Sequence, residues 1–289
     1  GLVRRAGLAM CAAEHGGGVA HRVFGERMDL EAQRALRLDG DLRHAIEHHE
    51  LAIHLQPRLD VATGALTGAE ALLRWRHQHP SSPDTASIVA TAERNGLIVP
   101  LGRWVLREAV HHAAELRRAG VLGPGMTVSV NISSHQLQED DFVDDLVGIL
   151  TQADLPPEML TVELTESSIL ADLYQARRQL NALAEIGVAL SIDDFGTGYS
   201  SLAYLRELPV RELKLDRLFV ADLGRDPTAE VIVRGVLEIA RGIGLETVAE
   251  GVERQEQLDV LRTTPCSQYQ GYLTSAAIPL SEFLSRYGR

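Results

Sequence analysis

Acidic and amide side chains recur at the ends of short β-prone runs in this 289-residue sequence. The clearest example is segment 188–202, VALSIDDFGTGYSSL, where an apolar run ends on Asp193 and Asp194 and a turn with two glycines follows. Two adjacent carboxylates repel each other and lose hydration on burial unless a cation or several donors meet them. The pair therefore belongs either to a solvated loop or to a metal site.

Polar residues of this kind stand near the ends of eight β-prone runs: Gln56, Glu70, Asn131, Glu163, Asp193 with Asp194, Lys214 with Asp216, Glu250 and Gln270. Five carboxylates in one cavity would raise one another's pKa unless cations neutralised them. Carboxylate and amide oxygens without Cys or His ligands suit hard ions, so the set predicts Mg²⁺ or Mn²⁺. Adjacent aspartates can share one carboxylate between two ions about 3.5–4 Å apart, an arrangement that serves displacement at phosphorus.

The elements that must position these residues follow from periodicity. The β-prone runs are 51–60, 65–75, 126–132, 160–166, 187–194, 210–216, 245–251 and 266–272. The helical segments are 30–49, 101–119, 140–153, 173–186, 228–243 and 255–261. The last six runs alternate with helices, which indicates parallel strands joined by right-handed crossovers. The turn VATG between the first two runs indicates a hairpin, so one of these strands should oppose the rest.

This order predicts an α/β fold, a modified TIM (β/α)8 barrel with one antiparallel strand in the opening hairpin. Functional groups of such barrels gather at the carboxyl ends of the strands, where the residues above would converge. Within the run 160–166, period-two alternation turns Thr161 and Glu163 inward and their neighbours toward the helices.

Composition narrows the range of functions further. The net charge of −12 argues against binding a nucleic-acid polymer or an anionic membrane. No run reaches the ~20 apolar residues of a membrane span, so we expect no membrane contact by this stretch. Cys11 and Cys266 lie far apart without metal-ligand spacing, which indicates reduced thiols and a cytoplasmic location. Because the sequence begins with Gly rather than Met, we expect a longer protein, in which a membrane anchor could lie upstream.

Seven segments match one known family in order and spacing: AEALLRW (69–75), VNIS (130–133), ELTES (163–167), DDFGTGYSSL (193–202), KLD (214–216), AEGVE (249–253) and QGYL (270–273). From about Leu30 to the C-terminus the chain thus resembles the EAL-domain phosphodiesterases, which hydrolyse cyclic di-GMP to linear pGpG. The resemblance implies their modified TIM barrel, with its antiparallel strand.

The resemblance also implies a role for each site residue. Glu70, Asn131, Glu163 and Asp193 would bind one ion, and Asp193, Asp194 and Glu250 the second. Lys214 would touch the attacking water or the phosphate, which makes Lys214, Glu70, Asp193 and Asp194 the expected catalytic residues. Gln56, Arg74 and Gln270 would hold the dinucleotide, and Asp216 would support the metal shell. Glu166 would anchor the loop DFGTGYSSL, which couples the metals to a dimer interface, so a homodimer through the region near Phe195–Ser201 is expected.

The beginning of the chain resembles a different family. Residues 2–29 are similar to the last helix and strand of a GGDEF domain, the diguanylate cyclase module often fused ahead of an EAL domain. Residues 1–29 are therefore predicted to be the remnant of that domain and its linker, and residues 30–289 the EAL barrel, with 30–49 as the connecting helix. Segment 275–279, SAAIP, stands where SRPLP is more usual, which removes an arginine near the ligand mouth.

Three functions remain open at this point. The leading one is two-metal hydrolysis of cyclic di-GMP, in which a water attacks phosphorus. The second is a catalytically silent cyclic di-GMP receptor that regulates a partner, although no metal ligand is missing. The third is an aldolase that forms a Schiff base on Lys214, which surrounding carboxylates disfavour because they keep the amine protonated.

Overall fold

The computed structural model describes residues 40–46, 48, 50–75, 85–196 and 207–288. The chain forms two compact units, one of residues 1–51 and 75–98 and the other of residues 52–74 and 99–289. The predicted GGDEF remnant at 1–29 lies outside the described residues, as do residues 30–39 of the predicted connecting helix and most of the loop after Phe195.

The smaller unit contains two helical segments among its described residues. Residues 40–46 are helical, within the segment 30–49 for which the sequence predicts a helix. Helix α3 (Thr85–Arg94) lies where the sequence analysis places none. Its buried residues Ile88, Thr91 and Ala92 have helical spacing, but two of the three are small or polar. The apolar stripe is therefore too weak to predict this helix.

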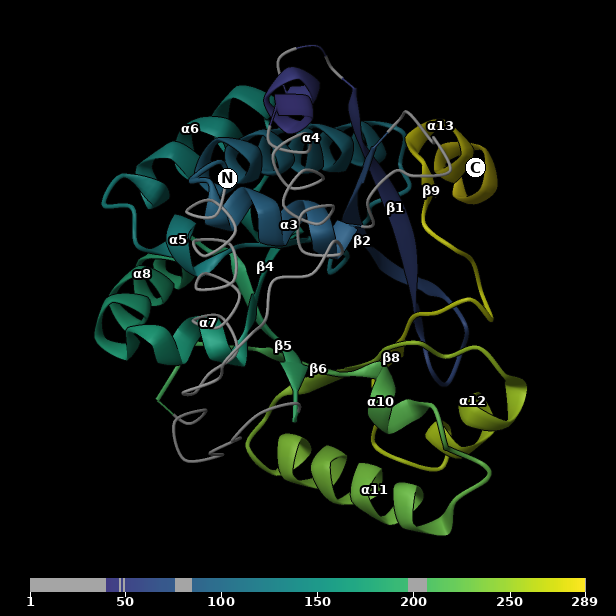
Figure 1. Cartoon of the computed structure of the whole chain (residues 1–289). Coiled ribbons are helices and arrows are strands. Elements are labelled where there is room, and N and C mark those ends of the chain that lie inside the picture. Colours follow the sequence, from purple (N-terminus) through teal and green to yellow (C-terminus); the bar gives the residue numbers. More distant parts are fainter. Residues whose placement is uncertain (1–39, 47, 49, 76–84, 197–206, 289) are drawn as a thin grey trace, which may run out of the picture. The chain divides into compact units, whose positions relative to one another are not determined.

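The larger unit contains a closed ring of eight strands (Figure 1). The strands are β1 (Leu51–Asp60), β2 (Leu66–Trp75), β3 (Thr127–Asn131), β4 (Leu160–Thr165), β5 (Ala189–Phe195), β6 (Glu212–Leu215), β7 (Glu246–Ala249) and β8 (Gln268–Tyr269). Their order is β2-β3-β4-β5-β6-β7-β8-β1, and β1 pairs with β2 to close the ring. Neighbours from β2 to β8 run parallel, whereas β1 runs antiparallel to β8. The predicted barrel with an antiparallel strand is confirmed.

A ninth strand, β9 (Ile278–Pro279), extends the sheet without entering the ring. It pairs antiparallel with β1, where Ile278 lies opposite Leu55. This strand is not predicted from the sequence, since a two-residue run has no periodicity.

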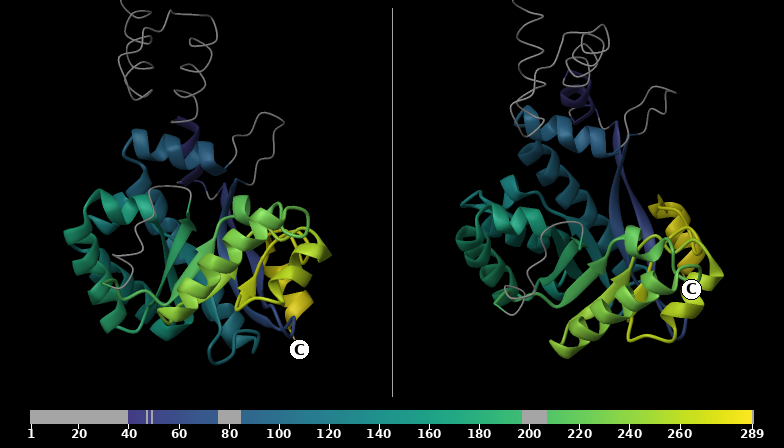
Figure 2. Two further views of the ribbon diagram at one scale, coloured as in Figure 1. Left: turned by 90° about the horizontal axis from the view of Figure 1, so that it is seen from below. Right: turned by 60° about the horizontal axis from the view of Figure 1, so that its bottom comes forward.

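Helices lie outside the ring of strands (Figure 2). They are α4 (Ile98–Arg118), α5 (Ser134–Leu137), α6 (Phe142–Ala153), the 3₁₀ helix η1 (Pro157–Met159), α7 (Glu166–Ala171), α8 (Leu173–Glu185), α10 (Arg217–Val220), α11 (Pro227–Gly242), α12 (Gln255–Leu261) and α13 (Leu280–Tyr287). Side-chain caps fix some of their starts: Asp226 accepts a hydrogen bond from the amide of Thr228 at the start of α11. No helix in the described residues is long and apolar enough to cross a membrane.

The two faces of the barrel strands differ in polarity. Outward-facing residues are apolar and buried: Val128, Val130, Val162, Leu164, Leu190, Ile192, Leu213 and Leu215. Inward-facing residues are polar and equally buried: Ser129, Thr161, Glu163, Ser191, Asp193, Glu212 and Lys214. The interior of an ordinary β/α barrel is filled by bulky branched side chains. This ring instead encloses polar groups, and we call its interior the lumen.

Candidate active site

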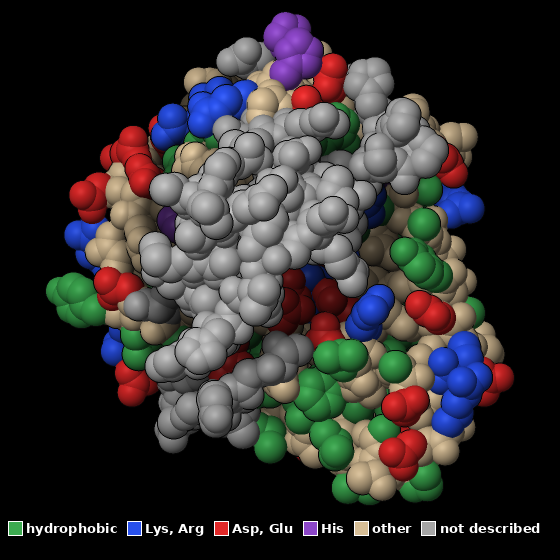
Figure 3. All heavy atoms as spheres, in the orientation of Figure 1, with side chains coloured by type: hydrophobic (Ala, Val, Ile, Leu, Met, Phe, Trp, Pro, Cys, Tyr) green, Lys and Arg blue, Asp and Glu red, His purple; other side chains and the backbone are tan. Residues whose placement is uncertain are grey.

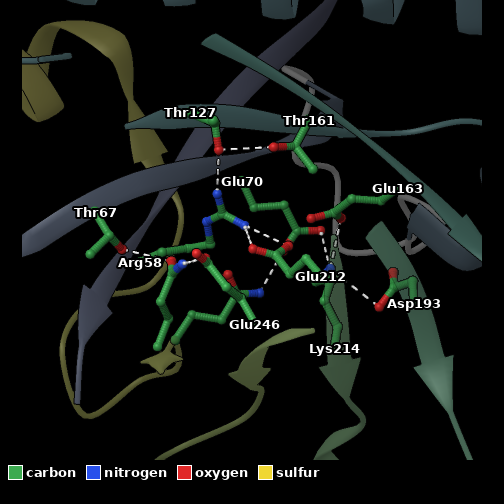
Figure 4. A network of polar contacts seen from close by, with 12 residues as sticks. Arg58, Thr67, Glu70, Thr127, Thr161, Glu163, Asp193, Glu212, Lys214 and Glu246 are labelled. Atoms are coloured by element: carbon green, nitrogen blue, oxygen red, sulfur yellow. Dashed lines mark hydrogen bonds and ion pairs between the residues drawn. The ribbon is translucent and has the colours of Figure 1, made fainter. Parts of the chain in front are cut away.

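Lys214 on β6 lies in the lumen near the carboxylates of Glu70, Glu163 and Asp193 on other strands (Figure 4), and near that of Glu250 just after β7. Its Nζ is 2.7 Å from Glu163 Oε2, 2.7 Å from Glu250 Oε1, 3.2 Å from Asp193 Oδ1 and 3.5 Å from Glu70 Oε1. We call Lys214 and these four residues the carboxylate cluster. Among the described residues, one ammonium faces four acids here, so the ionised cluster has excess negative charge. Acidic side chains lie recessed near the centre of the face in Figure 3.

Strand geometry brings these distant residues together. The neighbouring strands β2 to β7 are parallel, so their carboxyl ends meet at one end of the ring. Period-two alternation turns Glu163 and Lys214 inward, while Val162, Leu164 and Leu215 pack outward. Glu250 follows the last residue of β7 and stays on the same side of the strand as Val248. The sequence prediction that these strand ends converge is therefore confirmed for the five residues of the cluster.

Two amide side chains hold the acids in place. Asn131 Nδ2 donates to Glu70 Oε1 at 2.9 Å and to Glu163 Oε2 at 3.3 Å. Gln270 Nε2 donates to Glu70 Oε2 at 2.5 Å and to Glu250 Oε1 at 3.3 Å. Each amide thus bridges two carboxylates, and donors of this kind favour the ionised form of the acid.

The adjacent aspartates lie at an irregularity of β5. The register between β5 and β6 shifts between Ile192 and Phe195. Asp194 has a φ of 55°, a left-handed conformation that is uncommon and costly for a residue with a side chain. Its backbone amide donates to Asp193 Oδ1 at 2.9 Å. Strain of this kind gathers at functional sites, where surrounding structure holds it in place.

The charge of Lys214 is fixed by its neighbours. Burial alone lowers a lysine pKa, but Glu163, Glu250, Glu70 and Asp193 together raise the pKa of Lys214 well above its ordinary value. Burial likewise favours the protonated form of Glu70, yet Lys214 and the amide of Gln270 hold the pKa of Glu70 below its ordinary value. Lys214 is therefore a permanent ammonium and Glu70 a permanent carboxylate at neutral pH.

The other acids of the cluster hold protons more tightly. Burial raises the pKa of Glu163 well above its ordinary value, only partly offset by Lys214. Burial also raises the pKa of Glu250 to about 8, with repulsion from Asp193 adding to the effect. Burial and the charge of Asp193 raise the pKa of Asp194 to about 6. One lysine does not neutralise all the acids, so the remaining negative charge favours protonation of some of them.

The donor set suits a hard divalent cation in chemistry and charge. Glu163 Oε1 and Gln270 Oε1 are buried and lack a hydrogen-bond partner among the described residues. Oxygen ligands of this type are those preferred by Mg²⁺ and Mn²⁺. Within the described part of the chain, no three His, Cys, Asp or Glu side chains are already grouped as a metal site, and Lys214 Nζ lies between the carboxylates. Ion binding would therefore require cations to enter beside the ammonium.

Four predicted residues do not belong to the carboxylate cluster. Gln56 Nε2 donates to the carbonyl of Ser275 at 3.1 Å, and Arg74 Nη1 donates to the carbonyl of Leu73 at 2.8 Å. Asp216 caps α10 by accepting a hydrogen bond from the Leu218 amide at 2.8 Å. Glu166 is buried at the first position of α7. The loop that Glu166 is predicted to anchor includes residues 197–202, which lie outside the described part, so that role stays a prediction.

The lumen contains a second charged group, which was not predicted from the sequence. Arg58 Nη1 lies 3.0 and 3.2 Å from the two carboxylate oxygens of Glu212, and Arg58 Nη2 donates to Thr127 Oγ1 at 2.6 Å. Thr161 Oγ1 donates to the same Thr127 oxygen at 2.9 Å. We call these four residues the amino-end clamp, because they lie near the amino ends of β3, β4 and β6 (Figure 4). The same alternation that predicts Gln56 and Lys214 would have predicted Arg58 and Glu212, each two residues away.

Comparison with known proteins assigns the chain to a family. A family model described as "EAL domain" matches residues 39–277. The chain belongs to the EAL-domain family. It is 38% identical over 289 residues to "Cyclic di-GMP phosphodiesterase NbdA" of Pseudomonas aeruginosa, covering 99% of this chain and 37% of that protein. It is 37% identical over 284 residues to "Bifunctional diguanylate cyclase/cyclic di-GMP phosphodiesterase MucR" of the same organism, covering 98% of this chain and 41% of that protein.

A solved EAL structure has the same fold. The structure of the "PaMucR Phosphodiesterase, c-di-GMP complex" superimposes with a TM-score of 0.81 at 38% sequence identity, covering 86% of this chain and 100% of that one. The EAL chain spans less than half the length of its curated relatives NbdA and MucR.

Proposed function

We propose that this EAL domain hydrolyses cyclic di-GMP to linear pGpG with two divalent cations, Mg²⁺ or Mn²⁺. The observation that carries the proposal is the carboxylate cluster, in which three buried acids on three strands and the half-buried Glu250 just after β7 surround one ammonium. Excess negative charge of this kind calls for cations. The names of NbdA and MucR support cyclic di-GMP as the substrate, and EAL phosphodiesterases are in general dependent on divalent metals.

The chain's residues divide between two ion sites in the proposal. Glu70, Asn131, Glu163 and Asp193 would hold one cation, and Asp193, Asp194 and Glu250 the other. When bound, two such cations acidify a water and offset charge that develops on the phosphate. Asp193 serves both sites, and the turn of β5 at Asp194 supplies two consecutive carboxylates at one strand end.

Lys214 holds a positive charge throughout the reaction. Its ammonium keeps the acids apart at fixed distances and can donate to the attacking water or to a phosphate oxygen. Gln56, Arg74 and Gln270 would hold the dinucleotide, and Asp216 would support the metal ligands. Because Gln270 already donates to Glu70 and Glu250, the residue would link substrate binding to the position of the acids.

The pKa of Lys214 argues against Schiff-base chemistry. An amine attacks a carbonyl only in its neutral form, and the pKa of this lysine lies well above the ordinary value. Lys214 is also the only lysine in the sequence. Borohydride reduction with a carbonyl substrate should therefore leave the single lysine unmodified, as read by peptide mass spectrometry. An adduct on Lys214 would place the protein in the aldolase class.

The proposal has a direct test. The purified chain is incubated with cyclic di-GMP and Mg²⁺ or Mn²⁺, with and without EDTA, and the products are separated by chromatography. We expect pGpG with either metal and none with EDTA. Saturable binding of cyclic di-GMP without turnover under any metal would instead identify a silent receptor.

The wider context is also part of the proposal. We propose that a GGDEF domain precedes residues 30–289 in a cytoplasmic protein, and that two copies pair through the region near Phe195–Ser201. Sedimentation velocity of the chain with and without cyclic di-GMP tests the pairing. A monomer at concentrations that support full activity would contradict it.

A further inference from the structure

We propose that Arg58 is a positioning residue for the carboxylate cluster. Its guanidinium, held at the other end of the lumen, ties together the strands that carry Lys214, Glu163 and Asn131. The test of this proposal by enzyme activity rests on the proposed function. The tests by metal binding and by spectroscopy do not depend on it.

The amino-end clamp spans the ring of strands. Arg58 comes from β1, Glu212 from β6 and Thr127 from β3, and Thr161 joins from β4 through Thr127. Strands β1, β3 and β6 are not neighbours in the ring, since β2 lies between β1 and β3, β4 and β5 lie between β3 and β6, and β7 and β8 lie between β6 and β1. The side chains therefore fix distances across the lumen that backbone pairing between neighbours does not fix directly.

Each clamp strand also carries a member of the site a short distance along the chain. Glu212 precedes Lys214 by two residues, and Thr161 precedes Glu163 by two residues. Two residues along a strand correspond to about 6.6 Å on the same face. A displacement at the clamp therefore reaches the carboxylate cluster through a short, rigid segment of strand.

Gly68 on β2 provides the room for this arrangement. A Cβ at this position would lie 3.1 Å from Arg58 Nη2 and 2.2 Å from the carbonyl oxygen of Thr127. Glu70, two residues further on β2, belongs to the carboxylate cluster. The absence of a side chain at Gly68 thus lets the guanidinium reach from β1 past β2 to β3.

The clamp has the properties of a rigid connector. Arg58 is 1% exposed and Glu212 is 7% exposed, so water does not compete for their contacts. The guanidinium presents its donors in a fixed planar fork, whereas a lysine ammonium is a flexible point charge. A buried pair of this type is weak grounds for inferring stability, because desolvation offsets its attraction. We therefore assign the Arg58–Glu212 pair a role in positioning neighbouring groups.

Two variants separate positioning from charge and from stability. Arg58→Lys keeps the charge and loses the fork to Glu212 and Thr127. Arg58→Met with Glu212→Leu removes both charges and fills the space with apolar atoms, which often preserves stability in a buried ion pair. The control is Arg234→Lys, which removes a two-contact fork to Thr263 on the outside of the barrel.

The first readout is metal binding without turnover. The apparent Kd for Mn²⁺ is obtained for each variant from the dependence of the melting temperature on Mn²⁺ concentration. Supporting residues around metal ligands typically contribute roughly 10- to 100-fold in affinity or activity, so we expect a shift of that size in both Arg58 variants. Arg234→Lys should match the wild type. Wild-type Mn²⁺ affinity in Arg58→Lys would show that only charge matters, and a lowered melting temperature with unchanged Mn²⁺ affinity would show a role in stability alone.

The second readout uses the single lysine. With lysine labelled with ¹³C at Cε, the wild type and the double variant each give one side-chain signal, that of Lys214. We expect this signal to shift or broaden in the double variant and to stay in place in Arg234→Lys. Should Arg58→Lys fail to fold, Thr127→Val repeats the metal measurement, because it keeps the ion pair and loses the Nη2 contact together with the hydrogen bond from Thr161. An unchanged lysine signal together with wild-type Mn²⁺ affinity in the folded variants would overturn the proposal.

Turnover of cyclic di-GMP is the last readout and separates the two proposals. We expect kcat to fall roughly 10- to 100-fold in both Arg58 variants with a smaller change in KM, because misplaced catalytic groups cost turnover more than binding. If the wild type itself does not hydrolyse cyclic di-GMP, the proposed function fails. The metal and lysine measurements would still decide whether Arg58 positions the cluster.

Discussion

Two buried cations lie in the same lumen, and their surroundings differ in charge. Arg58 in the amino-end clamp faces one carboxylate, that of Glu212. It also donates to the hydroxyl of Thr127, which accepts a second hydrogen bond from Thr161. Lys214 in the carboxylate cluster faces four acids within 3.5 Å. The clamp is thus neutral in its immediate contacts, whereas the ionised cluster has an excess of three negative charges among the described residues.

This difference in charge balance indicates different roles: the clamp connects strands, and the cluster is suited to chemistry. In a neutral, hydrogen-bonded pair, little is gained by adding another ion. In the cluster, burial and repulsion raise the pKa of Glu163 well above its ordinary value and that of Glu250 to about 8. An arriving cation would displace those protons, and a site in that state is ready for metal.

The clamp and the cluster also differ in whether arginine or lysine supplies the positive charge. The chain has one lysine and 28 basic residues of both kinds, so arginine supplies nearly all its positive charge. The planar guanidinium of Arg58 directs Nη1 to both oxygens of Glu212 and Nη2 to the hydroxyl of Thr127. The compact ammonium of Lys214 instead meets oxygens of four residues at 2.7–3.5 Å, a geometry that a guanidinium does not reproduce.

The largest expected effect comes from breaking the cluster at its shared ligand. Asp193→Asn keeps the volume and removes a charge that serves both proposed ion sites. We expect hydrolysis of cyclic di-GMP to fall by more than about 10³-fold, with the circular dichroism spectrum unchanged. The matched control is Asp144→Asn on the exposed face of α6, which should retain full activity. Near-normal turnover in Asp193→Asn would remove the two-metal site as proposed.

Removing the cation of the cluster should affect both stability and activity. Lys214→Met leaves four acids without their ammonium, and breaking a buried pair typically costs about 3–5 kcal/mol in the free energy of unfolding. We expect that loss in EDTA, and a partial recovery with Mg²⁺, because bound cations would offset the same charge. Urea denaturation with and without Mg²⁺ measures both.

A charge-preserving variant sharpens this result. Lys214→Arg should recover part of the lost stability and little of the hydrolysis, since its fork cannot take the place of the ammonium. Equal activity in the arginine variant and the wild type would show that charge alone matters at this position. Full activity in Lys214→Met would exclude the lysine from the mechanism.

The next effect is a pH dependence that only the cluster should show. The folded-state pKa of Glu250 is about 8, against an ordinary value of 4.5, so the folded protein holds this proton more tightly than the unfolded chain. The resulting stability is fully present below about pH 4.5 and is lost as the pH rises through about 8. In EDTA we therefore expect the wild type to lose on the order of a few kcal/mol more than Glu250→Gln between pH 5 and pH 8.

Metal binding should depend on pH in the opposite direction from stability. Ligands must lose their protons to bind, so Mg²⁺ affinity should rise over the same pH range. Calorimetric titrations at pH 6 and pH 8 test this, together with the number of protons released. Parallel pH profiles for the wild type and Glu250→Gln in EDTA would mean that Glu250 is already ionised without metal.

Alternation along each strand was sufficient to predict the inward residues of the cluster. Glu163 and Lys214 stand between apolar neighbours, and period two assigns them to the lumen without knowledge of the other strands. Predicted helices 101–119 and 228–243 agree with α4 and α11 to within a few residues, because their apolar stripes are continuous.

Other features depend on contacts between distant strands. Which inward residues meet is decided by the stagger of the closed ring and the reach of each side chain, and neither can be read from one strand. For this reason the pairing of Arg58 with Glu212 was not predicted, although the convergence of Lys214 with the acids was. The left-handed conformation of Asp194 was also missed, since no local signal favours it over an ordinary strand residue.

The smallest expected effect lies at the edge of the amino-end clamp. Thr161→Val removes the hydrogen bond that Thr161 Oγ1 donates to Thr127 Oγ1 and leaves the contacts of Arg58 in place. We expect a loss of about 1 kcal/mol in the free energy of unfolding, measured by urea denaturation, and less than about a threefold change in turnover. Thr127→Val also removes the acceptor of the charged Arg58 donor, where a loss of about 1.5–3 kcal/mol is expected. If Thr161→Val reduced hydrolysis as strongly as Asp193→Asn, the two ends of the lumen would not differ in role as their charges indicate, and the hydroxyl of Thr161 would itself belong to the catalytic machinery.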